Sequence, residues 1–238
     1  MMLDTLQEYG WTYLYTDGYS ITGLATTLWM TSAAVLTGFV LSIPLALALC
    51  SKNPWLKTSV ATFTYIFRGT PLFVQLLLIY SGIYSFTFVQ QTPFLSAIFR
   101  EGLNCALLAF ILNTTAYTTE IFAGTIRTTK KSEIEACVAF GMTWWQMMRR
   151  VVLPSALRRA IPAYSNEVIY LLHATSIAFI VTVKDLMAVA RDVNANTFRS
   201  FEAFGIAALL YLLTTFTLLI LFRKAEARWL RYMKPARH

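Results

Sequence analysis

Charged residues are scarce in this sequence. Only 13% of its 238 residues are Asp, Glu, Lys or Arg, about half of the share in soluble domains, while 57% are hydrophobic. Four stretches contain no charged residue, and a fifth is interrupted only by Glu167. About 20 apolar residues cross the hydrocarbon core of a bilayer as a helix, so these stretches indicate an integral membrane protein. They are residues 18–51, 69–99, 102–119, 160–183 and 203–222.

The apolar stretches are continuous and do not alternate with polar residues. Only helices and closed barrels satisfy the backbone inside lipid, and barrel strands would alternate. We therefore predict an all-α membrane protein with about five transmembrane helices. Because no repeat or linker is evident, residues 1–238 are expected to form a single membrane domain. After a short amphipathic segment, helices are expected at 21–50, 57–85, 97–127, 157–183 and 202–229.

Several chemical motifs are missing. The three cysteines, Cys50, Cys105 and Cys137, have no metal-ligand spacing and are expected to be packing residues. There is no Gly-x-x-x-x-Gly-Lys-Ser/Thr sequence to hold nucleotide phosphates, and no Ser-His-Asp set or Gly-x-Ser-x-Gly. We therefore expect a chain that is not an enzyme and has no metal or cofactor of its own. The first 17 residues lack Lys and Arg, so no cleavable signal peptide is predicted.

The net charge is +8, but the basic residues lie at the ends of the apolar segments, so nucleic acid is not an expected partner and membrane lipid is. If the N-terminus is outside, the inward-facing segments carry 16 of the 20 basic residues. Positive residues are retained in the cytoplasm, which predicts an N-out, C-in topology. The four basic residues expected outside are Arg100, Lys184, Arg191 and Arg199.

The loop between the third and fourth expected helices has helix signals of its own. Ser132 followed by Glu135 has the spacing of a capping box, and Thr143 followed by Gln146 repeats it. Gly141 is placed to end the first short helix in a left-handed conformation. The Trp and Met residues of the second short helix fit either the membrane interface or a rigid protrusion that binds a soluble partner.

This loop resembles the EAA loop of ABC importer permeases. That pattern is Glu-Ala-Ala, three residues, Gly, nine residues, an aliphatic residue, any residue, and Leu-Pro. Cys137 replaces the second Ala, and Val151 fills a place often held by Ile. The resemblance implies that residues 128–156 form a coupling loop that sits in a cleft of an ATPase subunit. Its matching residues are Glu135, Ala136, Gly141, Leu153 and Pro154.

The resemblance extends over nearly the whole chain. FRGTPLFVQLLLIYSG (67–82), LNTTAYTTEIFAGTIR (112–127) and PAYSNEVIYLLHATSIAF (162–179) are typical of permeases in the polar amino acid uptake group. The two ends of the chain look closest to permeases of histidine/lysine-arginine-ornithine importers.

The resemblance implies a permease of the bacterial inner membrane that carries polar or basic amino acids such as histidine, arginine, lysine and ornithine. It also implies its partners: a second similar permease, two ATPase subunits that hold ATP and Mg, and a periplasmic amino-acid-binding protein. The outer segment 184–202 is expected to help receive that binding protein.

Glu167 is the sharpest chemical feature inside the apolar segments. It lies eight residues beyond Arg159, about 12 Å along a helix. An acidic side chain at such depth costs about 2.5 to 3.5 kcal/mol on insertion scales. It therefore needs a partner, a water-filled cavity or a proton. A cationic group on a passing amino acid and a hydroxyl or amide on a neighbouring helix are both open interpretations, and the resemblance favours substrate.

Other polar residues share helix faces with this position or face it from other helices. In the second expected helix, Gly69-Thr70-Pro71 interrupts the regular backbone hydrogen bonding. This break could expose backbone groups to a transport route or could be a packing kink. Glu120 could bind substrate or pair with Arg68 or Arg127, and His173 could be a buried structural residue. The candidate substrate-binding residues are Glu167, Asn166, Tyr170, His173, Thr175, Ser176, Asn113, Tyr117, Glu120 and Gln75.

Two other functions fit the same residues. A proton-coupled secondary amino acid transporter would use Glu167 and Glu120 as relay carboxylates. A membrane scaffold would use the loop to recruit a cytosolic partner. An associated ATPase distinguishes the importer from both.

Overall fold

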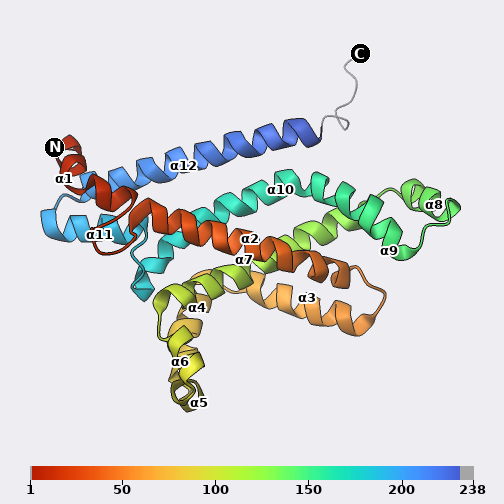
Figure 1. The fold of residues 1–238 in the computed structure, drawn as a ribbon, viewed down its shortest axis with the longest axis horizontal. Helices are drawn as coiled ribbons and strands as arrows, with labels where there is room; N and C mark the ends of the chain where they lie inside the picture. Colours follow the sequence, from red (N-terminus) through yellow and green to blue (C-terminus); the bar gives the residue numbers. More distant parts are fainter. Residues whose placement is uncertain (1, 231–238) are drawn as a thin grey trace.

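The computed structural model describes residues 2–230, and the regular elements in this range are all helical. The four longest helices, α2, α7, α10 and α12, run along the long axis of the molecule (Figure 1). The short helices α8 and α9 lie at one end of this bundle, α1 and α11 at the other, while α5 and α6 project to the side. The all-α prediction is confirmed.

The helices have the following bounds: α1 Met2–Leu14, α2 Gly23–Leu49, α3 Pro54–Gly69, α4 Leu72–Leu77, α5 Thr87–Gln91, α6 Pro93–Phe99, α7 Gly102–Arg127, α8 Lys131–Ala139, α9 Trp144–Met147, α10 Leu153–Ala174, α11 Leu186–Thr197 and α12 Ser200–Trp229. Two π-helical turns, Leu78–Gly82 and Met148–Val152, follow α4 and α9. Two 3-10 segments, Ile83–Ser85 and Thr175–Val181, complete the order.

Three helices of the described part are long and apolar enough to cross a membrane: α2, α7 and α12. Helix α3 and the segment Leu72–Ser85 meet these criteria together, as a span bent by 103°. Helix α10 falls outside this set because Arg158, Arg159 and Glu167 lower its hydropathy. The fifth span and the N-out, C-in orientation stay predictions.

The expected continuous helix 57–85 is wrong. The chain bends at Thr70, which has an extended backbone with φ −113° and ψ 144°. Pro71 explains the bend, because a proline disfavours helical geometry in the residue before it and has no N–H to donate. The chain therefore leaves the bundle axis through α4 and continues into the side arm of α5 and α6.

Helix α7 is the central helix of the bundle. It packs against α2, α3, α4 and α10, and small or β-branched residues line much of its buried surface. Phe110 is fully buried towards one end and Phe122 towards the other, each inside a separate apolar cluster. A third cluster around Tyr13 and Leu186 joins α1, α11 and α12. On α12, in contrast, only Ala203, Ile206 and Ala207 are buried.

The first residue of α7, Gly102, packs against the 3-10 segment Thr175–Val181. A Cβ placed on Gly102 would lie 1.8 Å from the backbone oxygen of Val181. Backbone atoms cannot move aside as a flexible side chain would, so only glycine allows this close contact. Gly124, on the same helix, has open space instead, because no atom lies within 4 Å of the position that a Cβ would occupy there.

The two glycines of α7 give a matched test of this packing. We expect Gly102→Ala to lower the free energy of unfolding by about 1–3 kcal/mol, because the added methyl group forces the elements apart. Gly124→Ala should be neutral or slightly stabilising, since alanine is the better helix former. Thermal unfolding of the purified chain in detergent measures both changes. Equal melting temperatures for the two variants would contradict the contact.

Candidate functional site

The predicted coupling loop forms a helical protrusion, α8 and α9, at one end of the bundle (Figure 1). The expected capping box of Ser132 and Glu135 is wrong. Lys130 is the N-cap residue of α8, with an extended backbone, and no side chain caps this helix end. Ser132 therefore lies inside the first turn, where its hydroxyl is past the position that serves an N-cap. Glu133, in that same turn, complements the helix dipole.

The predicted end of α8 at Gly141 is confirmed. Gly141 has a φ of 69°, and its N–H donates to the oxygen of Val138 at 2.9 Å. The N–H of Met142 donates to the oxygen of Cys137 at 3.0 Å. These two bonds form a Schellman motif, which satisfies the last carbonyls of the helix. The turn between α8 and α9 is therefore fixed by backbone bonds that require a left-handed residue.

The capping box at the start of α9 is also confirmed. The Thr143 N–H donates to Gln146 Oε1 at 2.9 Å, and the Gln146 N–H donates to Thr143 Oγ1 at 3.4 Å. Pro154 lies in the first turn of α10, directly after the π-helical turn Met148–Val152. The loop thus has ordered ends on both sides of the turn.

The protrusion carries exposed apolar side chains as well as charged ones. Glu135 and Ala136 are exposed on α8, and Leu153 and Pro154 are half-buried where α10 begins. Exposed apolar side chains this close together usually mark a surface that binds a partner. They are Val138, Phe140, Trp144 and Trp145.

Glu167 is buried on α10, with 7% of its surface exposed. Its Oε1 atom has no hydrogen-bond partner among the described residues. Thr114 of α7 and Arg68 of α3 are near enough to interact with the carboxyl group. The structure therefore places an incompletely satisfied acid between three helices.

Two tyrosines and an arginine surround the approach to Glu167. The rings of Tyr117 and Tyr170 are 6.1 Å apart, and the guanidinium of Arg68 lies 5.3 Å from the centre of the Tyr117 ring. The Tyr117 hydroxyl donates to the backbone oxygen of Arg68 at 3.3 Å. Aromatic faces of this kind attract cations.

Glu120 has partners that Glu167 lacks. Arg68 lies 3.7 Å from it, and the Thr64 hydroxyl donates to it at 2.8 Å. The predicted alternative of an ion pair with Arg68 is confirmed, and Arg127 instead donates to the oxygen of Leu49 at 3.3 Å. Of these two carboxyl groups, Glu167 is the more deeply buried, and its Oε1 has no hydrogen-bond partner among the described residues.

Gln75 and Asn113 hold the break between α3 and α4. The Gln75 amide donates to the oxygens of Phe67 and Thr70 at 2.8 and 3.0 Å. The Asn113 amide donates to the same Phe67 oxygen at 2.9 Å and to Gln75 Oε1 at 3.2 Å. These side chains satisfy carbonyls that a continuous helix would have satisfied itself.

The other candidates on α10 and the 3-10 segment point elsewhere. His173 is within 2.9 Å of Thr215 on α12, and Ser176 lines a recess with it, so both face α12. Thr175 is fully buried and donates to the oxygen of Leu172. Asn166 is exposed beside Glu167. Tyr170 thus contacts Tyr117 of α7 whereas His173 contacts α12, so these two residues of the expected common face meet different helices.

Sequence reasoning did not assign a role to Asp185, which is fully buried at the N-cap of α11. Its Oδ1 accepts the N–H of Ala188 at 2.9 Å, and its Oδ2 has no hydrogen-bond partner in the described range. Burial raises the pKa of this carboxyl group to about 7, against the lowering effect of the backbone donors. An Asp directly before the first apolar residue of a helix is an N-cap signal, so the sequence could have shown that Asp185 starts this helix.

Asp185 gives a pH-dependent prediction. An aspartic acid in an unfolded chain has a pKa near 3.9, so only the folded chain keeps the proton between about pH 4 and about pH 7. Stability should therefore fall as the pH rises through this window, by on the order of 1 kcal/mol per pH unit, and then level off. Asp185→Asn keeps an N-cap acceptor and should remove this dependence.

Thermal unfolding from pH 4.5 to pH 8, roughly spanning the two pKa values, measures the effect. Asp192→Asn, an exposed position on the same helix, is the control and should behave as the unchanged chain does. An Asp185→Asn variant that keeps the full pH dependence would contradict the assignment.

No group of three or more His, Cys, Asp or Glu side chains in the described residues is placed to hold a metal ion. The site around Glu167 is therefore built from a carboxyl group, an arginine and aromatic rings. Its chemistry fits reversible binding of a polar, cationic molecule.

Comparison with known proteins assigns the chain to a family. The family model described as "Binding-protein-dependent transport system inner membrane component" matches residues 34–232. The histidine/lysine/arginine/ornithine transport system permease protein of Escherichia coli is 54% identical over 235 residues, covering 99% of both chains. The nopaline transport system permease protein of Agrobacterium fabrum is 39% identical over 206 residues, covering 87% of this chain and 86% of the relative.

A solved structure has the same fold. It is a crystal structure of an amino acid ABC transporter with histidines, with a TM-score of 0.81 and 28% sequence identity. The match covers 96% of this chain and 98% of the other. Similarity in sequence and in fold thus extends over the whole described bundle and includes residues 128–156, the predicted coupling loop.

Proposed function

This chain belongs to the inner membrane components of binding-protein-dependent transport systems, and we propose that it is the permease of an ATP-driven importer for basic and polar amino acids. Histidine, arginine, lysine and ornithine are the proposed substrates. The observation that carries this proposal is the 54% identity, over 99% of both chains, to a permease named for those four amino acids. The proposed location is the bacterial inner membrane, with the N-terminus outside.

The buried Glu167 supports a cationic substrate. A carboxylate away from water is stable only when a positive group or a set of donors compensates it. Arg68 is already paired with Glu120, so it compensates Glu167 only in part. An ammonium or guanidinium group of a substrate would complete the balance, and the rings of Tyr117 and Tyr170 would add cation–π attraction.

The coupling loop supports a separate energy source. We propose that Glu135 and Ala136, with the turn at Gly141, dock in a cleft of an ATPase subunit, and that Leu153 and Pro154 pass the motion on to α10. The proposed assembly has two ATPase subunits that hold ATP and Mg, a second similar permease and an external amino-acid-binding protein. The outer segment around α11 would help receive that binding protein.

Motion of the loop would reach the substrate site along one helix. Pro154 and Glu167 are 13 residues apart on α10, about 20 Å along the axis. A tilt of α10 would change the surroundings of Glu167 relative to Tyr117 and Arg68. Because a ligand shifts an equilibrium only by binding one state more tightly, Glu167 should meet substrate preferentially in one of the two states.

Glu167→Gln tests the substrate site. We expect uptake of arginine and lysine by the reconstituted complex to fall by about tenfold or more, because the amide cannot compensate a cation and a charged hydrogen bond contributes about 1.5–3 kcal/mol. The complex should still assemble. Glu226→Gln on α12 is the matched control and should transport normally, because the Glu226 side chain makes no hydrogen bond or ion pair within residues 2–230.

Normal uptake kinetics in Glu167→Gln would contradict substrate binding by Glu167 and would indicate a structural role. Uptake driven by a proton gradient in the isolated chain, without an ATPase, would instead support the secondary transporter and contradict the importer.

Gly141→Ala and Glu135→Ala test coupling. Alanine at Gly141 meets no atom within 4 Å, so its cost comes from the left-handed backbone alone, roughly 1–2 kcal/mol. We expect both variants to insert in the membrane but to lose most substrate-stimulated ATP hydrolysis and uptake. Gly18→Ala is the control, because Gly18 is also left-handed (φ 93°) and uncrowded but lies between α1 and α2, outside the predicted coupling loop. Undiminished transport in both loop variants would contradict the coupling assignment.

A further inference from the structure

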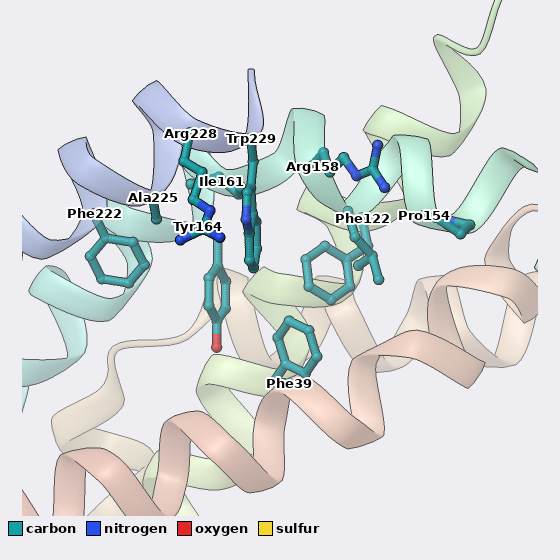
Figure 2. A pocket seen from close by; sticks show the side chains of 11 residues that line it. Phe39, Phe122, Pro154, Arg158, Ile161, Tyr164, Phe222, Ala225, Arg228 and Trp229 are labelled. Atoms are coloured by element: carbon teal, nitrogen blue, oxygen red, sulfur yellow. The ribbon is translucent and has the colours of Figure 1, made fainter. Parts of the chain in front are cut away.

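A cavity of about 890 Å³ opens between the last third of α12 and the helices α2, α7 and α10. Figure 2 shows its walls: Arg228 and Trp229 extend from α12, while Tyr164 of α10 points across the cavity towards Phe39 of α2. Of the residues around the candidate substrate site, Arg68, Tyr117, Glu167 and Tyr170 do not line this cavity. It is therefore a separate feature of the bundle.

The interior of the cavity is apolar and largely aromatic. The Phe39 ring lies 5.4 Å from the Phe122 ring and 5.5 Å from the Tyr164 ring, and the Phe222 ring lies 6.4 Å from that of Tyr164. The Tyr164 hydroxyl is already used, since it donates to the oxygen of Val35 at 3.4 Å. An apolar cavity of this size beside a membrane-crossing helix offers an energetically favourable place for hydrocarbon.

The charges at the cavity are all positive. Arg158 and Arg228 line it, and neither guanidinium group makes a hydrogen bond or ion pair with another residue in the described range. Lys224 joins Arg228 in an adjoining recess of about 400 Å³. No described Asp or Glu lines either space. The two guanidinium groups are therefore available to an anion.

The charges and the aromatic rings are arranged by depth. On α10, Arg158 precedes Tyr164 by six residues, and on α12 Arg228 follows Phe222 by six residues, so each helix places its cation about 9 Å from its ring along the axis. The arginines lie at the end that the basic residues predict to face the cytoplasm. On both of these antiparallel helices, the arginine thus lies near the predicted membrane surface and the aromatic ring lies deeper in the membrane.

We propose that this cavity binds a phospholipid with an anionic head group, such as phosphatidylglycerol, from the cytoplasmic leaflet. The phosphate would lie between Arg158 and Arg228, Trp229 would cover the interfacial region, and an acyl chain would fill the aromatic interior. Basic pockets between helices on the cytoplasmic side suit such head groups, and guanidinium groups bind phosphate through paired hydrogen bonds. A zwitterionic phospholipid has the same phosphate, but its ammonium group would add a positive charge beside the two arginines, so it should bind less tightly.

The test uses the full chain in its detergent-solubilised transport complex. Native mass spectrometry, with phosphatidylglycerol or phosphatidylcholine added, measures the apparent affinity of each lipid. We expect phosphatidylglycerol to bind more tightly, and Arg158→Gln with Arg228→Gln to weaken it by about 25-fold, roughly fivefold for each arginine. Lys52→Gln with Arg223→Gln removes the same charge outside the cavity and should leave the affinity unchanged.

A second variant separates cavity binding from simple charge attraction. Ala225 lines the cavity, so Ala225→Trp should block the acyl chain while both arginines remain, and should also weaken phosphatidylglycerol binding. Phosphatidylglycerol with a photoactivatable acyl chain should label residues of 154–164 and 222–229.

Three results would overturn the proposal. The first is equal affinity for the two lipids. The second is full binding by Ala225→Trp, which would place the lipid on the arginines alone. The third is cross-linking of position 225 to the second permease in place of lipid labelling, which would show that protein covers the cavity.

Discussion

A backbone inside lipid has to satisfy its own hydrogen bonds, and this constraint governs the structure most clearly where α3 ends. Pro71 ends the helix and leaves carbonyls without an intrahelical donor. Gln75 and Asn113 donate to them, and Asn113 comes from α7. The break is therefore tied to the central helix, and the same ties place Arg68 beside Tyr117 and Glu120. Two residues that sequence reasoning assigned to substrate act here as ties that make the site possible.

The two acidic side chains of this region have different roles because their surroundings differ. Glu120 is half-buried and has both a hydroxyl donor and a guanidinium. Glu167 is more deeply buried and keeps one oxygen without a partner in the described residues. The cost of burying a charge makes the second arrangement unfavourable unless something else binds there. In the proposed transport site, the substrate would supply stabilisation that the empty protein lacks.

Hydrophobic pattern predicted the long helices well, since α2 and α12 begin and end within two residues of the expected 21–50 and 202–229. Gly141 was predictable because a left-handed turn favours glycine. The cap of α8 was not, because Lys130 begins the helix through its backbone alone and has no side-chain signal. The contact of His173 was also missed, because the sequence does not show which helix packs beside α10 at this position, and His173 meets Thr215 of α12. Tertiary contacts decide such cases.

The path from the loop to the site is continuous, whereas the path from α3 is interrupted. Helix α9 runs through the π-helical turn Met148–Val152 directly into α10, with Val152 fully buried in the core. No extended residue lies between the exposed tryptophans and Glu167, so in the proposed mechanism a force on the protrusion would pass to α10 along a continuous helical run. Helix α3, in contrast, ends at an extended Thr70. Glu167 can therefore move relative to Arg68 and Glu120, because the two sides of the site belong to elements that are joined only through side chains.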